Sequence, residues 1–461
     1  MKLTLIYPGI GGKGFDSLGQ GMDSGWIGHG LAILAPCARA AGAEVDLIDL
    51  RALSGWEAFR SEVERRRPDV VGVSMMSADY NPAMQALEIV RQVDPGIRTC
   101  VGGPHPTICP QEVQDSPLVD HVFLGEGEVS FAEAVGRWRR GEEVPRVVPP
   151  VQPDLDRLPF ADHELFLAEW RRWGYQLDSP EAPFVPELPP PFVTIIAGRG
   201  CMYNCSYCQP AERHIFGRRV RRRSVQNVIA ELKELAERYR FRSFMFHDDC
   251  LTEDREWVIE FCRAYREAGF RQPFFCQSRA DIIVKNEDMV ALMARAWLRG
   301  YLIGFESGSD RVLSFIRKVT RVWQNVEAAR ICRRHGIAIW ANYMLGLPTE
   351  TQDEMRATIR MLKRIDPDYY SPAFYTPHPG SDLFDYCQAH DLSLIVDHDS
   401  YRRNPTEIKI KGHDPEFLRW ALAESQRRTL PNRVRRGARG LWRRYAQPRK
   451  VWRRLRAVAG V

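Results

Sequence analysis

Short apolar runs alternate with helical patterns along most of the chain. In the second half, segments between the runs show apolar residues at helical spacing, as in Glu231–Arg240, Glu256–Ala268 and Gln324–Gly336. The last of these ends on a glycine, which suits a helix C-cap. Alternating strands and helices predict a parallel sheet with right-handed crossovers, here a partial barrel of about six units. The six predicted strands are 192–197, 242–247, 273–277, 301–305, 337–343 and 369–375.

The first 130 residues have a separate pattern. A helix is expected over Gly30–Ala41, closed by Gly42, and the strand and helix order predicts a doubly wound α/β domain of the Rossmann or flavodoxin type. Glycines at 9, 11, 12, 14, 19 and 21 raise the question of a phosphate loop, but no Gly-Lys-Ser/Thr occurs and no Gly-x-Gly-x-x-Gly opens the helix. The predicted strands are Leu3–Tyr7, Glu44–Asp49, Asp69–Met75, Ile97–Val101 and His121–Leu124.

Eleven prolines fall between residues 145 and 191. Proline fixes φ and donates no backbone hydrogen bond, so this segment is predicted to be an extended connector. Within it, Leu155–Phe160 is expected to dock at the domain interface. The predicted organisation is therefore an α/β domain over 1–144, a proline-rich linker over 145–191, a partial barrel over 192–385 and a C-terminal region over 386–461.

Cys201, Cys205 and Cys208 form a Cys-x₃-Cys-x₂-Cys loop directly after the apolar run at 192–197. Thiolates hold iron–sulfur clusters, and a [4Fe–4S] cluster has four irons, so three cysteines leave one iron open to a substrate or cofactor. The alternatives are a zinc site, which lacks a second cysteine pair to complete four ligands, and a chance grouping of free thiols. The spacing favours the open cluster.

The loop and four later segments resemble the radical S-adenosylmethionine (SAM) superfamily. The segments are Phe246–Asp249, Gln277–Asp281, Ile303–Gly308 and Asn342–Thr351, each at the end of a predicted strand. The loop differs slightly from the family pattern, with Met202 where proline is common and Gly198 where a small hydroxyl residue is frequent. The resemblance implies a cluster on the three cysteines and SAM binding by Tyr207, Phe246, Asp248, Gln277, Arg279, Gly304, Glu306, Asn342 and Leu345. From the residues alone, Asp248 is also a candidate helix N-cap and Glu306 a candidate ion-pair partner.

Two motifs of the first domain also follow predicted strands. They are Gly102–Thr107 (Gly-Gly-Pro-His-Pro-Thr) and Gly125–Glu128 (Gly-Glu-Gly-Glu), where glycines would let a planar ligand approach the backbone. With Ser74 they resemble the cobalamin-binding domain of a large radical SAM subfamily, over about residues 1–385. The resemblance implies cobalamin binding by Ser74, Gly102, Gly103, His105, Thr107, Gly125, Glu126 and Gly127. The Asp-x-His-x-x-Gly motif of other cobalamin enzymes is absent, so we expect base-off cobalamin, with His105 orienting the ligand or capping a turn rather than coordinating cobalt. The alternative is a domain that has lost its ligand.

The basic C-terminal tail changes the charge balance. Residues 427–461 carry a charge of +13 with no acidic residue, while the whole chain carries +6, so the rest sums to −7. Apolar residues recur on one face, and a basic amphipathic helix with tryptophans suits an anionic membrane surface. There are two alternatives: the apolar face packs on the barrel, or the tail binds nucleic acid. No nucleic-acid-reading module is recognisable. The apolar face comprises Val434, Ala438, Leu441, Trp442 and Tyr445, then Val451, Trp452, Leu455 and Val458.

Composition favours an intracellular enzyme. The eight cysteines outside the loop show no disulfide spacing, as expected in a reducing compartment. Met1–Tyr7 runs straight into a strand, which leaves no room for a signal peptide, and no run of about 18 apolar residues occurs. We expect a cytoplasmic protein that is peripheral on the inner face of the membrane through its tail.

The resemblance implies a cobalamin-dependent radical SAM C-methyltransferase. In that family one SAM gives a 5′-deoxyadenosyl radical and another supplies a methyl group through cobalt. The alternatives are a cyclase or oxidative rearrangement enzyme without methyl transfer, acting on a tetrapyrrole or natural product, and an RNA- or protein-modifying enzyme. The expected substrate is a small molecule or membrane lipid such as a hopanoid, and the expected electron donor is a flavodoxin or ferredoxin.

Overall fold

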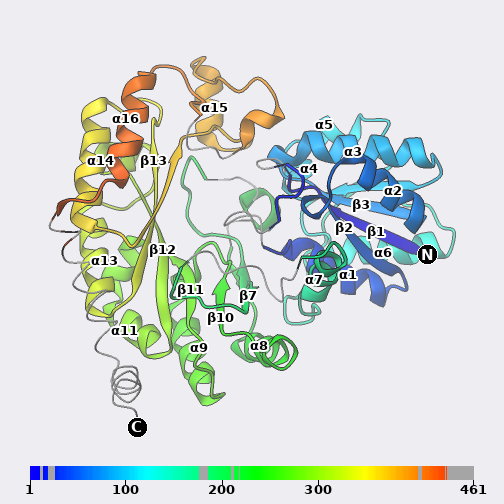
Figure 1. Ribbon diagram of the computed structural model, residues 1–461, viewed down its shortest axis with the longest axis horizontal. Helices are drawn as coiled ribbons and strands as arrows, with labels where there is room; N and C mark the ends of the chain where they lie inside the picture. The colour runs from blue at the N-terminus through cyan, green and yellow to red at the C-terminus, as the bar shows by residue number, and fades with distance from the viewer. Residues whose placement is uncertain are drawn as a thin grey trace, which may run out of the picture.

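Two parallel β-sheets, each covered by helices, form two domains that lie side by side (Figure 1). The computed structural model describes residues 1–10, 14–18, 26–175, 185–208, 212–217, 219–402, 407–430, 432 and 434. Within this part of the chain, no helix is long and apolar enough to cross a membrane. The predicted fold class, an α/β domain followed by a six-stranded partial barrel, is confirmed.

The first domain has a six-stranded parallel sheet in the order β2-β1-β3-β4-β5-β6. The order reverses direction between β1 and β3, and ligands of such sheets bind beyond the strand ends at this switch point. Apolar clusters fill both faces, one beneath α1, α6 and α7 and the other beneath α2 and α3. The strands are β1 (Lys2–Tyr7), β2 (Glu44–Asp49), β3 (Val70–Ser74), β4 (Arg98–Gly102), β5 (His121–Phe123) and β6 (Val147–Val148). The helices are α1 (His29–Ala40), α2 (Trp56–Arg66), α3 (Tyr80–Val93), α4 (Pro104–Ile108), α5 (Pro110–Gln114), α6 (Glu128–Arg139) and α7 (His163–Arg172), with 3₁₀ turns η1 (Leu50–Ala52) and η2 (Ser77–Asp79).

The prediction of an extended connector over 145–191 was wrong for much of that segment. Strand β6 extends the first sheet, and helix α7 packs on β2 and α1. Trp170 of α7 is fully buried, and its indole N–H donates to Asp49 Oδ2 at 2.8 Å. Prolines flank this helix but none lies inside it, so Asp162 begins it by accepting the Leu165 N–H. The proline count therefore gave a wrong picture of a segment that completes the first domain.

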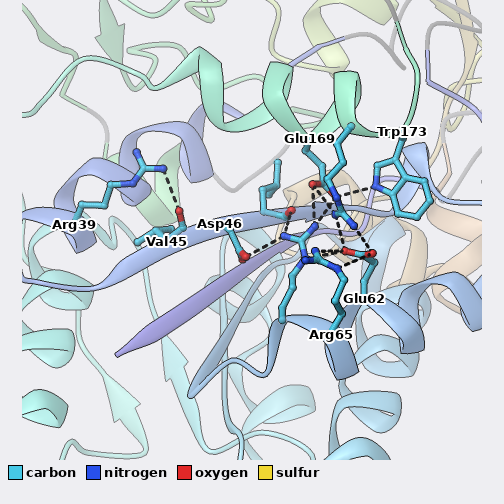
Figure 2. Close-up of polar contacts among 10 residues, drawn as sticks. Arg39, Val45, Asp46, Glu62, Arg65, Glu169 and Trp173 are labelled. Carbon is cyan, nitrogen blue, oxygen red and sulfur yellow. Dashed lines mark hydrogen bonds and ion pairs between the residues drawn. The ribbon is translucent and has the colours of Figure 1, made fainter.

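Helix α7 is also held by a buried network of opposite charges, drawn in Figure 2. Arg66 of α2 donates to Glu62 of its own helix at 2.9 Å and to Glu169 of α7 at 2.8 Å. Arg172 pairs with Glu62 from the other side. These pairs lower the pKa of Glu62 to about 2 even though burial opposes ionisation. Glu62, Arg66 and Glu169 are each less than a tenth exposed, so losing any one of them would leave a buried charge without its partner, which is costly.

The second domain has a parallel sheet in the order β14-β13-β12-β11-β10-β7, and all six predicted strands are present. Helices cover its outer face (Figure 1). The strands are β7 (Phe192–Ile195), β10 (Ser243–Phe246), β11 (Phe274–Ser278), β12 (Leu298–Glu306), β13 (Ala338–Leu345) and β14 (Tyr369–Phe374); β8 (Gly198–Arg199) and β9 (Arg221–Arg222) form a short antiparallel pair. The helices are α8 (Val225–Tyr239), α9 (Arg255–Glu267), α10 (Ala280–Lys285), α11 (Glu287–Arg295), α12 (Asp310–Phe315), α13 (Val322–Arg334) and α14 (Gln352–Ile365), with π-helix η3 (Glu212–Phe216) and 3₁₀ turn η4 (Leu251–Glu253).

The C-terminal region returns to both domains. Helix α15 (Asp382–Ala389) leads to the 3₁₀ turn η5 (His398–Tyr401), which packs on η2 and α3 of the first domain. Helix α16 (Pro415–Gln426) packs on α14 of the second domain. Most of the predicted basic tail, including Trp442 and Trp452, lies outside the described residues, as do glycines 11, 12, 19 and 21.

Candidate active site

The three cysteines lie in a loop that starts at the β8–β9 pair. Gly200 precedes the first of them with φ +91°, and a Cβ there would stand 3.1 Å from the Arg219 carbonyl oxygen. Cys205 is buried, Cys201 is partly buried and Cys208 is exposed, and none forms a disulfide. Neighbouring Ser206 fixes the loop, since its N–H donates to the Ile316 carbonyl and its carbonyl accepts from the Leu383 N–H.

Arg279, at the end of β11, reaches the cysteine loop. Its guanidinium lies over the Tyr203 ring at 3.6 Å from the centroid, and Nη1 lies 3.9 Å from Cys205 Sγ. Its Nη2 donates to the Lys318 carbonyl at 2.6 Å, and Nε donates to Asp281 at 3.1 Å. Burial opposes its charge, but Asp281 and Cys205 together keep its pKa above the usual value. A fixed cation therefore stands beside one thiol, where it offsets the charge of a thiolate.

Glu306, at the end of β12, joins a buried triad with Lys318 and Tyr207. Lys318 Nζ donates to Glu306 Oε1 at 3.0 Å and to Tyr207 Oη at 3.2 Å, while the tyrosine hydroxyl donates to the same carboxylate oxygen at 2.9 Å. Burial works against the Lys318 charge, yet the Glu306 carboxylate outweighs it and raises the pKa of the ammonium. Sequence reasoning missed Lys318, because it lies in the loop after α12 and belongs to no motif.

The backbone around this triad is unusual. Glu306 has φ +59°, a left-handed conformation that is costly for a residue with a side chain. The register of β12 against β13 shifts between Gly304 and Glu306, and the glutamate carboxylate lies over Gly304. A Cβ at Gly304 would overlap the Glu306 carboxylate and would stand 2.7 Å from Lys318 Nζ. Only glycine leaves room for the ion pair at this position.

Strand register divides the predicted SAM-binding residues between the two faces of the sheet. Gln277 pairs with Leu302, and Gly304 pairs with Asn342, so these residues share the face that is turned away from the helices. Phe246 and Leu345 lie on the opposite face. The Phe246 ring packs on Phe261 of α9, and Leu345 is fully buried in the same apolar cluster. The side chains of these two residues are therefore part of the core.

Asp248, after β10, is also buried. Its Oδ2 accepts the Ala197 N–H at 2.9 Å, and Arg222 of β9 lies at 3.5 Å. Burial raises the pKa of this carboxyl to about 6, although Arg222 opposes the rise. Asp248 does not cap the next helix. Asp254 caps α9 by accepting the Trp257 N–H. Asp248 instead fastens the start of the cysteine-bearing β8–β9 pair to the end of β10.

A cavity of about 470 Å³ opens at the carboxyl ends of the first sheet, between the two domains. This volume is within the range of small-molecule and cofactor sites. Its walls come from the ends of β1, β3, β4 and β5 on one side and from Gly198, Arg199, Phe216 and His247 on the other. The same β8–β9 segment that begins the cysteine loop therefore also bounds the cavity.

Eight of the described residues that line this cavity are glycines. Among them, Gly103 has φ +105° and Gly125 has φ +63°, so both backbones favour glycine. A Cβ at Gly103 would lie 3.1 Å from the Met75 backbone. Six of the eight residues predicted to bind cobalamin line this cavity: Ser74, Gly102, Gly103, Gly125, Glu126 and Gly127.

Thr107 and His105, which complete that predicted set, are not among the residues that line the cavity. Thr107 Oγ1 donates to the Gly103 carbonyl and accepts the Gly125 N–H, both at 2.8 Å, so it joins the two glycine loops. His105 is fully buried with its Nδ1 at 3.1 Å from Ser77 Oγ. The cavity wall contains two other histidines, His29 and His247, and burial lowers the pKa of both.

Ion pairs join the cavity walls across the domain boundary. Arg199 of the second domain pairs with both Glu126 and Glu128 of the first, and Arg221 pairs with Glu126. All four side chains are largely buried. Sequence reasoning singled out Glu126 as a ligand contact, but its carboxylate is already engaged by two arginines. The signal that was overlooked is Arg199, which stands two residues before the first cysteine.

Two adjoining sites thus have complementary chemistry. The three thiols, with Arg279 and Lys318 close to Cys205, match an iron–sulfur cluster that has one open position. The largely apolar, glycine-lined cavity fits a bulky planar group.

Comparison with known families agrees with both assignments. The B12 binding domain family matches residues 23–135, and the radical SAM superfamily matches residues 195–362. The two matched segments coincide with the glycine-lined sheet edge and with the sheet that carries the cysteine loop.

Relatives of known name extend over most of the chain. An uncharacterized methyltransferase of Pyrococcus horikoshii is 27% identical over 372 residues, covering 77% of each chain. An anaerobic magnesium-protoporphyrin IX monomethyl ester cyclase of Rubrivivax gelatinosus is 25% identical over 94% of this chain and 78% of its own length. A hopanoid C-3 methylase of Methylococcus capsulatus is 26% identical over 77% of this chain and 67% of its own.

The fold has a counterpart among solved structures. The radical SAM methyltransferase TsrM from Kitasatospora setae, solved with cobalamin and a [4Fe–4S] cluster, superposes with a TM-score of 0.66. The match covers 90% of this chain and 84% of that one at 16% sequence identity. This likeness supports the arrangement of the two domains.

Proposed function

We propose that this chain, which belongs to the radical SAM enzymes with an amino-terminal cobalamin-binding domain, methylates an unactivated carbon atom of its substrate. Its cofactors are cobalamin, a [4Fe–4S] cluster and SAM. The observation that carries the proposal is the shared wall: residues 198–199 line the glycine-rich cavity and lead directly into the cysteine loop. A group in the cavity and a group on the cysteines would therefore face the same space between the domains.

When bound, the cluster supplies the electron that cleaves SAM, and cobalamin carries the methyl group. The chain's own residues bind and orient these groups. Cys201, Cys205 and Cys208 are the proposed cluster ligands. Gln277 and Asn342, on the face turned away from the helices, are proposed to hold SAM together with the Glu306–Tyr207 pair.

Product stoichiometry tests methyl transfer. Anaerobic turnover with SAM, methylcobalamin and a reductant should give S-adenosylhomocysteine and 5′-deoxyadenosine in about equal amounts with methylated product. One SAM supplies the methyl group and the other is cleaved reductively, so neither product can be missing. The Cys205→Ala variant is the matched control, because it keeps the cavity but loses a proposed cluster ligand. Formation of 5′-deoxyadenosine without S-adenosylhomocysteine would contradict the proposal.

A second candidate is a cyclase or rearrangement enzyme without methyl transfer. It is favoured by the Rubrivivax cyclase, whose match covers 94% of this chain, more than the match of either methyltransferase relative above. The same assay separates the two, since this reaction forms deoxyadenosine and an unmethylated product. A third class, modification of RNA or protein, has less support because no nucleic-acid-reading module is recognisable in the sequence.

For the substrate, we infer a membrane lipid of the polycyclic terpenoid class. The basic tail with its tryptophans and the similarity to a hopanoid methylase support this inference. Extracted lipids incubated anaerobically with the enzyme, SAM and methylcobalamin should gain a mass of one methylene, detected by mass spectrometry. A flavodoxin or ferredoxin is the proposed electron donor. If only soluble tetrapyrroles or antibiotic scaffolds are converted, the lipid inference is wrong while the methyltransferase proposal stands.

A further inference from the structure

Three metal-ligating side chains meet where the C-terminal region returns to the first domain. His105 comes from α4, Glu112 from α5 and His398 from η5, almost three hundred residues later in the chain. One ligand atom from each lies within 4.8 Å of the other two. None of the three lines the cavity or the cysteine loop, so this cluster is separate from the sites described above.

The Nε2 atom of His105 gives the main evidence for a bound ligand. Its ring is wholly buried, and Nε2 has no hydrogen-bond partner. Its other nitrogen, Nδ1, lies 3.1 Å from Ser77 Oγ, which fixes the orientation of the ring. Buried polar atoms are nearly always satisfied, so an orphaned nitrogen aimed at two other ligands needs an explanation.

We propose that His105, Glu112 and His398 bind a divalent transition-metal ion of the zinc class. Two imidazoles and one carboxylate are a common ligand set for such an ion, with a fourth position left for water. Ligand atoms about 2.0–2.2 Å from a tetrahedral ion lie roughly 3.3 Å from one another. Glu112 Oε2 lies 2.7 Å from His398 Nε2 and 3.6 Å from His105 Nε2, distances on either side of that value.

The surroundings favour this ligand set. The contact between Nδ1 of His105 and Ser77 Oγ leaves Nε2 to face the other two ligand atoms, and such a hydrogen-bonding contact at the far nitrogen is usual for a histidine that binds metal. Tyr80 stacks on His398 at 3.9 Å between centroids and holds that ring in place. An ordinary ion pair explains Glu112 and His398 but leaves His105 Nε2 unsatisfied.

The ion would fasten the C-terminal region to the first domain. Turn η5 packs on η2, the turn Ser77–Asp79, and Asp79 lines the cavity between the domains. A bound ion would therefore join His398 to α4 and α5 and hold η5 against the turn that contributes Asp79 to the cavity wall. Its expected role is structural.

Metal analysis of the full-length, cluster-loaded protein tests this proposal. After dialysis against micromolar zinc and then metal-free buffer, the wild-type protein should retain about one zinc per chain in addition to cluster iron. His398→Ala and Glu112→Gln should each weaken zinc binding more than about tenfold, and Ser77→Ala by roughly tenfold through loss of the outer hydrogen bond. The matched control is His335→Ala, which removes a partly exposed histidine whose nitrogen lies 3.2 Å from Glu287. It lies outside any three-ligand group of the described residues.

The same measurements in a Cys201→Ala, Cys205→Ala, Cys208→Ala background exclude zinc held by the cluster cysteines. X-ray absorption at the zinc edge should then show two imidazole ligands. Zinc should also raise the melting temperature of the wild type and the His335→Ala variant, but not that of His398→Ala. The proposal is overturned if the wild type retains no zinc, or if His398→Ala and Glu112→Gln retain as much as His335→Ala.

Discussion

Replacing Lys318 by methionine removes the cation of the buried triad and leaves Glu306 in place. Both side chains are less than a tenth exposed, and Nζ lies 3.0 Å from the carboxylate oxygen. Breaking such a pair costs about 3–5 kcal/mol, because the remaining charge stays buried without compensation. For a domain of this size, that cost corresponds to a fall in melting temperature of roughly 6–20 °C.

The assay follows thermal unfolding anaerobically in protein that carries the cluster but no cobalamin, so that the visible absorbance reports on the second domain alone. A double variant, Lys318→Met with Glu306→Gln, should recover much of the loss, because no unpaired charge remains. The matched control is Lys411→Met, whose partner Asp391 lies at a similar 2.8 Å but is almost fully exposed. It should leave the midpoint nearly unchanged, since water solvates both groups.

The pH dependence has a definite sign. The pKa of Lys318 is raised on folding, because Glu306 outweighs the effect of burial. A cation with a raised pKa adds stability below its unfolded pKa of about 10.4 and loses that contribution as the pH rises through the folded pKa. The difference between wild type and Lys318→Met should therefore stay constant from about pH 6 to 9 and shrink only above 10. A single variant that melts within about 2 °C of the wild type, or a double variant no more stable than the single one, would refute the reasoning.

Three further predictions follow from the sites. Cys201→Ala, Cys205→Ala and Cys208→Ala should each abolish 5′-deoxyadenosine formation and lower iron content after anaerobic reconstitution; a full cluster in any of them would contradict the assignment. Gly103→Val should reduce cobalamin occupancy, because φ is positive at this residue and a Cβ there would crowd the Met75 backbone at the cavity wall; the wild type should bind base-off cobalamin, and a histidine-ligated spectrum would contradict this. Deleting 427–461 should spare both cofactors and weaken sedimentation with anionic liposomes in a salt-dependent way, whereas loss of cofactors would make the tail a packing element.

Much of the fold follows from local pattern. Period and composition predicted all the strands of both parallel sheets except the two-residue β6, because parallel strands buried on both faces are nearly continuous apolar runs. Helix α7 was missed because the prolines around it dominated the reading of the segment. Its stability comes from Trp170 and Glu169, whose partners Asp49 and Arg66 lie about a hundred residues away. Contacts between residues so far apart in the chain cannot be predicted from a short stretch of sequence.

In the candidate site, too, local pattern could be predicted from the sequence and tertiary geometry could not. The sequence identifies the motif segments at the strand ends, but it does not predict which way their side chains point, because that direction depends on strand register. Phe246 and Leu345 belong to motif segments yet face the helices, and the bulge that turns Glu306 inward is invisible in the sequence. Lys318 contributes to the site through a contact twelve residues along the chain that no spacing rule predicts.

The docking of α7 has a consequence for synthesis of the protein on the ribosome. A first domain that ended at residue 144 could fold well before the cysteines were made. Because α7 supplies part of its core, that domain is complete only after Arg172 has emerged, shortly before Cys201. At about 5–20 residues per second, the interval between the two is a few seconds. Turn η5 reaches the first domain only after Tyr401 has been made, so that surface stays uncovered while the whole barrel is made.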